Sequence, residues 1–147
     1  MILDTKNWNE FRIYVDYLLT NYASNIYSKL PKEELFEDLI FAIFKVNKDD
    51  DLHFFYIKRD KYVWARFTML YIHYRFYKFE IHNDKNQNLY NKDHLTIAYA
   101  LTQVEQRLNT DKEYRKLTAA IWVIWNLYPV PFPKDFPIEK VRNLFKY

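Results

Sequence analysis

Apolar residues recur at three- and four-residue spacing along much of the chain, which is the pattern of one buried face on an α-helix. The first such stripe predicts a helix over residues 6–27. A second helix is predicted to begin near Pro31, because proline is favoured in the first helical turn. Glu33 and Glu34 follow at positions where the helix dipole favours negative charge. This helix is predicted to end before the polar run at residues 47–51.

The second half of the chain predicts a helical hairpin over residues 91–128 and a short last helix. Apolar residues at heptad spacing mark the first helix of the hairpin. Thr110 and Glu113 form a candidate capping box, in which the hydroxyl and the carboxylate each satisfy a backbone amide, and they predict where the second helix begins. The proline-rich residues 129–137 are predicted to be extended, and the short helix after them would bury Val141, Leu144 and Phe145.

The stretch RFTMLYIHYRFYKFEIH, residues 66–82, is aromatic at almost every other position, and it decides the fold class. If it were a strand, its inward-facing positions would change phase twice, which requires two bulges without a glycine or proline to mark them. A helix over residues 60–80 needs no interruption. Its apolar residues on two sides predict a central helix packed against more than one neighbour. The alternative is a small antiparallel sheet from residues 52–81.

These elements together predict a mainly α fold, a single-domain bundle of five to six helices over residues 1–147, whereas the sheet alternative would make the fold α+β. A chain of 147 residues, with 50% hydrophobic and 28% charged residues, fits one globular core. Its most apolar run, residues 119–125, is far shorter than the roughly 20 residues that a membrane helix needs. We therefore expect no membrane partner.

Two residue types are missing from the chain, and their absence excludes several classes of function. Without cysteine there are no disulfides, no thiolate metal sites and no cysteine nucleophile, and the cytoplasm is the predicted location. Without glycine there are no glycine-rich phosphate loops and no dinucleotide-binding fingerprint, so no cofactor is expected. The four histidines lack the spacing that would place two on one helical face, and no metal site is predicted.

Arg66 and His73 are the candidate catalytic pair, with six residues between them. Their spacing resembles the R-x(4–6)-H motif of HEPN-type ribonucleases, which are all-helical and independent of metal. The resemblance implies that Arg66 steadies a phosphate and that His73 takes part in acid–base chemistry on a 2′-hydroxyl. Arg75 and His82 have the same spacing. In the structural alternative, Arg66 lies at a solvated or ion-paired rim, and His73 is a partly buried, hydrogen-bonded imidazole.

Basic residues interleave with aromatic ones over residues 58–78, which is a pattern that can neutralise phosphates and stack bases. The same residue types also contribute much of the binding energy in protein interfaces, and 14 tyrosines and 4 tryptophans are more than a core of this size readily buries. The candidate binding residues are Lys58, Arg59, Lys61, Arg66, Tyr71, Tyr74, Arg75, Tyr77 and Lys78.

The favoured interpretation is a small non-catalytic protein that covers a surface of a partner protein. In general character the chain resembles the inhibitors and immunity proteins of mobile genetic elements, which implies an inhibitor, immunity or accessory role. Nucleic-acid binding through residues 58–78 is the alternative, followed by a HEPN-like ribonuclease. A homodimer stays open. Burial of Tyr71, Tyr74 and Tyr77 would indicate a packing role for the aromatic stretch, and exposure would indicate a binding role.

Overall fold

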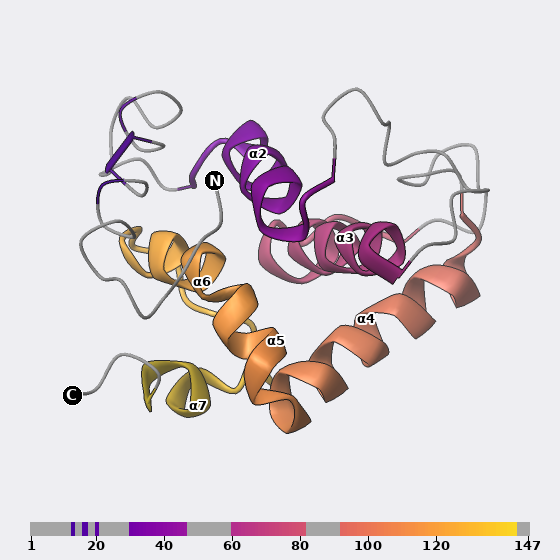
Figure 1. Ribbon diagram of the computed structural model, residues 1–147. Helices are drawn as coiled ribbons and strands as arrows, with labels where there is room; N and C mark the ends of the chain where they lie inside the picture. The colour runs from indigo at the N-terminus through magenta and orange to yellow at the C-terminus, as the bar shows by residue number, and fades with distance from the viewer. Residues whose placement is uncertain are drawn as a thin grey trace.

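The computed structural model describes residues 13, 16–17, 20, 30–46, 60–81 and 92–143, and all the regular structure in these ranges is helical (Figure 1). The elements are α2 (Glu33–Phe44), α3 (Asp60–Tyr71), the π-helical turn η1 (Ile72–Phe76), α4 (His94–Thr110), α5 (Lys112–Leu117), α6 (Ala119–Asn126) and α7 (Ile138–Arg142). The mainly α prediction is confirmed. The sheet alternative is wrong for residues 60–81, and residues 52–59 lie outside the described ranges. The predicted helix over residues 6–27 also lies mostly outside them.

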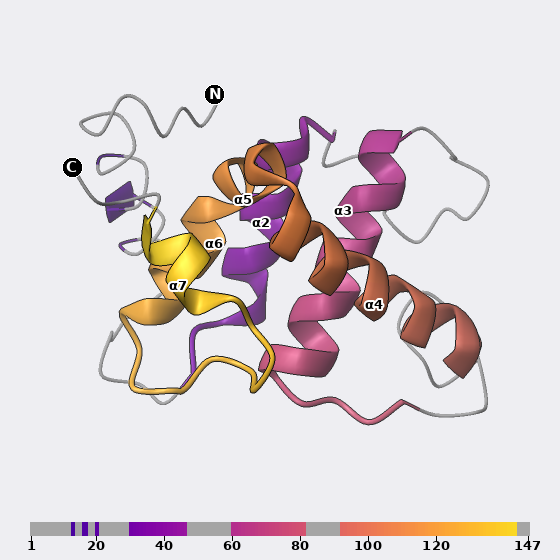
Figure 2. The same cartoon turned by 90° about the horizontal axis from the view of Figure 1, so that it is seen from below.

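Helix α3 occupies the centre of the bundle, as its two apolar sides predicted. It packs against α2 on one side and against α4 on the other, and the two perpendicular views agree on this arrangement (Figures 1 and 2). Buried residues from α2 to α7 form one contiguous core, to which α3 and η1 contribute many aromatic side chains. Residues 66–76 of the aromatic stretch are therefore part of a central packing helix, whereas residues 77–81 are not helical, so the predicted helix over residues 60–80 ends four residues early.

The end of this central helix widens into the π-helical turn η1, which the sequence pattern did not predict. The amide of Tyr77 donates to the carbonyl of Ile72 at 3.0 Å, five residues back instead of four. Phe76, the last residue of η1, thereby lies among the aromatic rings of the core. Its ring stacks on Trp122 at 5.5 Å and meets Trp125 edge-on at 4.8 Å.

Two helix ends use lysine at positive φ, the position that glycine usually occupies. Lys45 follows α2 with φ 55°, and the amide of Val46 donates to the carbonyl of Phe41 at 3.0 Å, which closes a Schellman motif. Lys78 follows η1 with φ 59°, and the amide of Phe79 donates to the carbonyl of His73. Because the chain has no glycine, a side chain takes the left-handed conformation at both ends, at a cost of roughly 1–2 kcal/mol each.

The predicted hairpin is present, but its cap differs from the predicted one. Thr110 is still the last residue of α4, and its hydroxyl donates to the carbonyl of Gln106 at 2.9 Å. Asp111 caps α5 instead, because its Oδ1 accepts from the amide of Tyr114 at 3.1 Å. The capping box of Thr110 and Glu113 is therefore wrong by one position.

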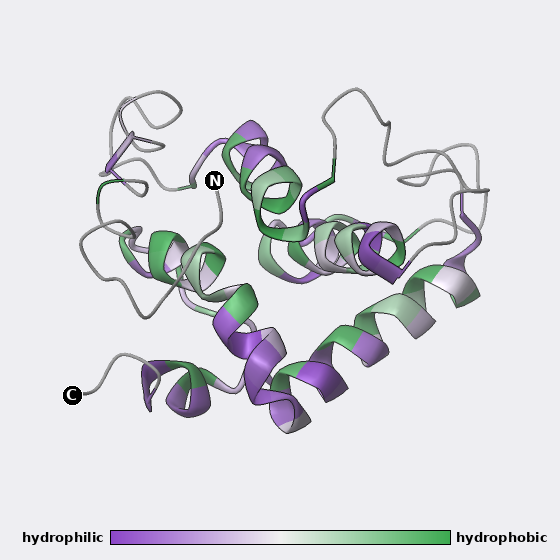
Figure 3. Cartoon of the chain, in the orientation of Figure 1, coloured by the Kyte–Doolittle hydropathy of each residue, from purple (hydrophilic) through white to green (hydrophobic). Residues whose placement is uncertain are grey.

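The second helix of the hairpin is not continuous, because it breaks at Thr118 into α5 and α6. Thr118 is buried, and its hydroxyl donates to the carbonyl of Tyr114 at 2.8 Å while it accepts from Nε1 of Trp122 at 3.0 Å. The α6 helix that follows is hydrophobic around most of its circumference (Figure 3). Such a helix belongs in a core, and its tryptophans pack against Phe76 of η1.

Residues 129–137 contain no helix and lead back along the bundle to α7 (Figure 2). Phe132 and Phe136 from this segment stack on each other at 4.8 Å, and both meet Phe76 edge-on. The short helix α7 begins at Ile138 and buries Val141, as the sequence predicted, whereas Leu144 and Phe145 lie outside the described ranges.

Candidate functional site

The candidate catalytic residues Arg66 and His73 lie in the central helix and are both buried. Arg66 is 7% exposed and His73 is 8% exposed. Arg66 is therefore not at a solvated rim, because the central helix packs on both sides, and the ion-paired form of the structural alternative stays a prediction. Seven residues along a helix separate the two positions by about 10 Å of axial rise.

The imidazole of His73 occupies an aromatic pocket that holds it neutral. Its ring lies 5.1 Å from the ring of Phe79 and 6.0 Å from that of Tyr77. Within the described ranges Nδ1 has no hydrogen-bond partner, so the alternative of a hydrogen-bonded imidazole is wrong for this atom. The nearest carboxylate oxygen, Oε2 of Glu33, is 3.9 Å from Nδ1. Burial lowers the pKa of His73 from 6.5 to about 4.

Glu33 completes this environment from the first turn of α2. Burial raises the pKa of Glu33 above its ordinary value, and repulsion from Glu34 adds to the effect. The hydroxyl of Tyr77 donates to the carbonyl of Pro31 at 2.6 Å and holds the start of α2 against the end of η1. At neutral pH the cluster thus presents a neutral imidazole in an aromatic pocket.

The predicted binding residues that the structure describes, from Lys61 to Lys78, do not lie together on one surface. Tyr71 and Tyr74 are buried in the core, and Tyr77 is partly buried. Arg75 pairs with a carboxylate, since its Nε donates to Oε1 of Glu105 at 3.1 Å. The ring positions in this part of the helix therefore indicate a packing role.

The exposed lysines of the predicted set lie at opposite ends of the central helix. Lys61 is in the first turn of α3, where its Nζ donates to the carbonyl of Lys45 at 3.2 Å, and Lys78 follows η1. Lys58 and Arg59 lie outside the described ranges.

No helix in the described ranges has both the length and the apolar character required to cross a bilayer. Nor do three metal-ligating side chains gather in this part of the molecule.

A different surface, on α4, shows large apolar side chains to solvent. Leu95 is 69% exposed and Tyr99 is 58% exposed, one helical turn apart. The exposed positions over the first turns of this helix, His94, Leu95, Thr96, Ala98, Tyr99 and Thr102, include no Lys, Arg, Asp or Glu. We call these six residues the neutral face of α4. In Figure 3 the corresponding half of α4 is mostly green and white, whereas purple dominates nearer its C-terminal end.

Partly buried rings of α3 continue the neutral face across the molecule. The ring of Phe67 meets that of Tyr99 edge-on at 6.2 Å, and the ring of Trp64 meets that of Phe67 at 5.4 Å. Trp64 also borders a shallow hollow of about 250 Å³. The other residues that line this hollow are Gln103, Gln106, Arg107, Thr110 and Asp111.

Arg107 closes the far side of this hollow with its guanidinium stacked on an aromatic ring. The guanidinium carbon lies 4.2 Å from the ring centre of Trp64 and 4.8 Å from that of Tyr114. Nε of Arg107 donates to Oδ2 of Asp111 at 3.1 Å, which fixes the group and offsets its charge. We call the neutral face, Phe67, Trp64 and the hollow together the α3–α4 surface.

Sequence reasoning missed this surface, although a signal for it was present. Residues 94–104, HLTIAYALTQV, contain no Lys, Arg, Asp or Glu in a chain that is 28% charged. The buried stripe of α4 uses Ile97, Leu101 and Val104, and this leaves Leu95 and Tyr99 without a place in the core. Apolar residues beyond the buried stripe, in a part of the helix without charged residues, are the signal that would have identified the surface.

The α3–α4 surface thus combines aromatic rings, one stacked guanidinium and a helical face without Lys, Arg, Asp or Glu. Comparisons of the chain with protein-family models, with curated proteins and with solved structures find no match.

Proposed function

We propose that this chain is a non-catalytic binding protein that covers a surface of a partner protein with its α3–α4 surface. The observation that carries the proposal is the exposure of Leu95 and Tyr99 on a helical face without charges. Contiguous exposed apolar patches rimmed by polar residues mark interaction sites on soluble proteins, and the ring of Phe67 continues the patch from Tyr99. Trp64 and the stacked Arg107 beside them are residue types enriched in protein interfaces.

The electrostatics of the surface favour a protein partner over a nucleic acid. A nucleic-acid site needs cations free to neutralise phosphates, and such binding weakens steeply with salt. On the α3–α4 surface the guanidinium of Arg107 is paired with Asp111, and the neutral face offers no cation. We therefore expect binding that depends mainly on apolar burial and that changes little with ionic strength.

An inhibitor, immunity or accessory role in the cytoplasm is the finer part of this proposal. Covering a surface requires no catalytic group, which agrees with the buried, neutral imidazole of His73. It also requires a rigid surface, and α3 supports one because it packs against helices on both of its sides.

The test is affinity capture with purified wild-type protein and an L95E/Y99E double variant. The wild type should retain one specific protein from the host, and the interaction should then be reproduced with the purified partner at both 50 and 300 mM salt. Two carboxylates in a desolvated interface should weaken binding at least about a hundredfold, because each places an unpaired charge against apolar groups. L117E is the matched control, since Leu117 is also an exposed leucine but lies on α5.

Equal binding of the partner by the wild type and by L95E/Y99E would overturn the proposal. Retardation of RNA or DNA with a steep loss between 50 and 300 mM salt would support the nucleic-acid alternative instead. A mass measurement by light scattering completes the test. We expect a monomer at micromolar concentration, because the neutral face exposes two large apolar side chains, Leu95 and Tyr99, which are few for the large apolar interface of an obligate homodimer.

A further inference from the structure

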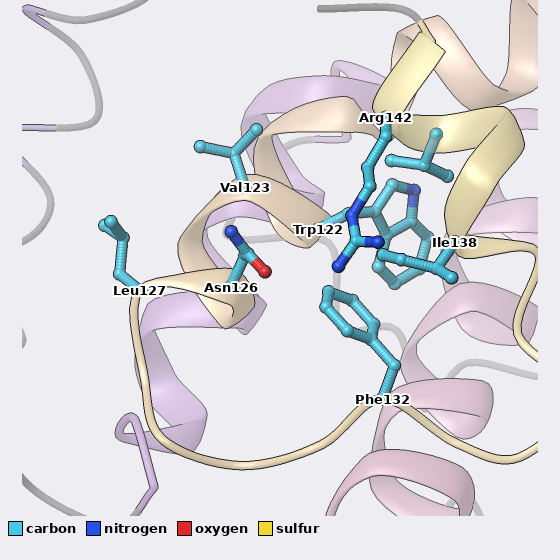
Figure 4. A pocket seen from close by; sticks show the side chains of 8 residues that line it. Trp122, Val123, Asn126, Leu127, Phe132, Ile138 and Arg142 are labelled. Carbon is cyan, nitrogen blue, oxygen red and sulfur yellow. The ribbon is translucent and has the colours of Figure 1, made fainter.

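A second hollow lies away from the α3–α4 surface, between α6, the segment after it and α7 (Figure 4). Its volume is about 350 Å³. It is lined by Trp122, Val123, Asn126, Leu127, Phe132, Ile138, Val141 and Arg142. In Figures 1 and 2 these elements lie across the molecule from the first turns of α4. This hollow is called the α6–α7 pocket below.

The aromatic walls of the α6–α7 pocket are fixed by the core behind them. Trp122 is buried and its Nε1 donates to the hydroxyl of Thr118 at 3.0 Å, so its ring has one orientation. Phe132 stacks on Phe136 at 4.8 Å, and Phe136 in turn meets the ring of Trp122 at 5.0 Å. A hollow with walls held in this way exists before a ligand arrives, which lowers the entropic cost of binding.

Two polar side chains border these apolar walls. Arg142 extends from α7 towards Phe132, on the same side of the pocket as the amide of Asn126 (Figure 4). Nη1 of Arg142 donates to Oε1 of Glu139 at 2.9 Å, but both side chains are more than half exposed, so the pair is screened by water and weak. A guanidinium offers five N–H donors in a planar fork, and this geometry matches a carboxylate.

We propose that the α6–α7 pocket binds a compact aromatic carboxylate. Its ring system lies between Trp122, Phe132 and Ile138, and its carboxylate accepts hydrogen bonds from Arg142 and from the amide of Asn126. The volume is near the lower end of the range for small-molecule sites, roughly 300–1,000 Å³, which limits the ligand to about two fused rings. The carboxylate competes with that of Glu139 for the guanidinium.

Isothermal titration calorimetry with naphthalene-2-carboxylate tests the proposal, with the neutral naphthalene-2-carboxamide as the matched ligand. The carboxylate should bind saturably and at least about tenfold more tightly than the carboxamide, because it makes charge-assisted hydrogen bonds to Arg142. The R142Q variant should lose this preference while it keeps the weak binding of the carboxamide.

Two tryptophan variants test the location. L127W fills the pocket from an exposed position and should weaken both ligands at least about tenfold, whereas L117W places the same ring on α5 and should leave both unchanged. An absence of saturable heat, equal affinity of the two ligands, or wild-type affinity in L127W would each overturn the proposal. L95E/Y99E should bind the carboxylate normally, so this inference and the proposed function fail or stand separately.

Discussion

Acidification should destabilise this protein through His73, and replacement of that residue should remove the part of the effect that comes from the buried imidazole. The imidazole is buried between Tyr77 and Phe79, so the folded chain resists its protonation. The unfolded chain has no such resistance. The perturbation is a change of pH from 7 to 4.5, applied to the wild type and to an H73L variant in which a side chain that cannot titrate fills the pocket.

The magnitude follows from the two pKa values of the imidazole. Burial lowers the pKa of His73 from 6.5 to about 4, which corresponds to roughly 3 kcal/mol of unfolding free energy. Because the folded pKa is the lower one, this contribution is fully present above pH 6.5 and is lost as the pH falls from 6.5 to 4. At pH 5 the loss should be about 2 kcal/mol.

Glu33 acts in the opposite direction. Its folded pKa is raised, so the folded chain takes up this proton more readily than the unfolded chain, and stability rises as the pH falls through that range. The carboxylate also lies 3.9 Å from Nδ1 of His73 and would attract a protonated imidazole. Both effects reduce the net loss in the wild type, so the comparison with H73L isolates the part that belongs to His73.

Urea denaturation at pH 7.0, 6.0, 5.0 and 4.5 measures this part directly. The difference in unfolding free energy between the wild type and H73L should change by about 2 kcal/mol between pH 7 and pH 5, in favour of H73L. H94Q is the control, because it replaces an exposed imidazole on α4. A difference between wild type and H73L that stays constant over this range would refute the reasoning.

Three further predictions concern stability, and urea denaturation at pH 7 checks each of them. K45G should stabilise the folded chain by about 0.5–1 kcal/mol, because glycine adopts the left-handed backbone conformation of Lys45 without strain, although it also raises the entropy of the unfolded chain. A destabilised variant would contradict this account of the end of α2. F76A should cost about 3–5 kcal/mol, since it empties the centre of the aromatic core, whereas F79A at an exposed site should cost much less. D111A should lower the free energy of unfolding by about 1 kcal/mol, because Asp111 caps α5, whereas T110A should change it by less than about 0.5 kcal/mol. A larger loss in T110A than in D111A would support the capping box of Thr110 and Glu113 instead.

The helical fold could be predicted from the sequence because a strand and a helix require different spacings of the buried apolar residues. Two phase changes without glycine or proline argued against a strand over residues 66–82, and the apolar positions on two sides of a helix indicated a central one. The structure has that helix between α2 and α4. Periodicity therefore decided both the element and its place in the bundle.

The details at helix ends could not be predicted, because neighbouring residues offer equivalent chemistry. Thr110 and Asp111 are both able to cap a helix, and the choice depends on where α4 ends, which its packing decides. The second helix breaks at Thr118, whose hydroxyl bonds to Tyr114 and Trp122 in the core. No local pattern announces such a break.

The candidate binding surface could not be predicted from the sequence, because residue type alone does not show which aromatic rings the neighbouring helices bury. The residue type of Tyr71 and Tyr74 does not show whether their rings are buried or exposed. Both are core residues because the neighbouring helices cover them. Leu95 and Tyr99, in contrast, lie on a helix whose buried stripe is already complete. A search for apolar residues left over after each stripe is assigned would have identified them.

The π-helical turn has a consequence for how this chain tolerates insertions and deletions. Relative to a regular α-helix, η1 contains one additional residue, and each residue of an α-helix turns the chain by about 100°. Residues before it are oriented by α2 and α4, and Phe76 at its end is oriented by the tryptophans of α6. A deletion of one residue within Ile72–Phe76 would restore a regular helix and leave the residues on either side close to their present orientation, because the bond from Tyr77 to Ile72 closes one wide turn with one residue more than an α-helical turn. The same deletion in α3 would rotate the following residues by about 100° and remove Phe76 from the tryptophans of α6.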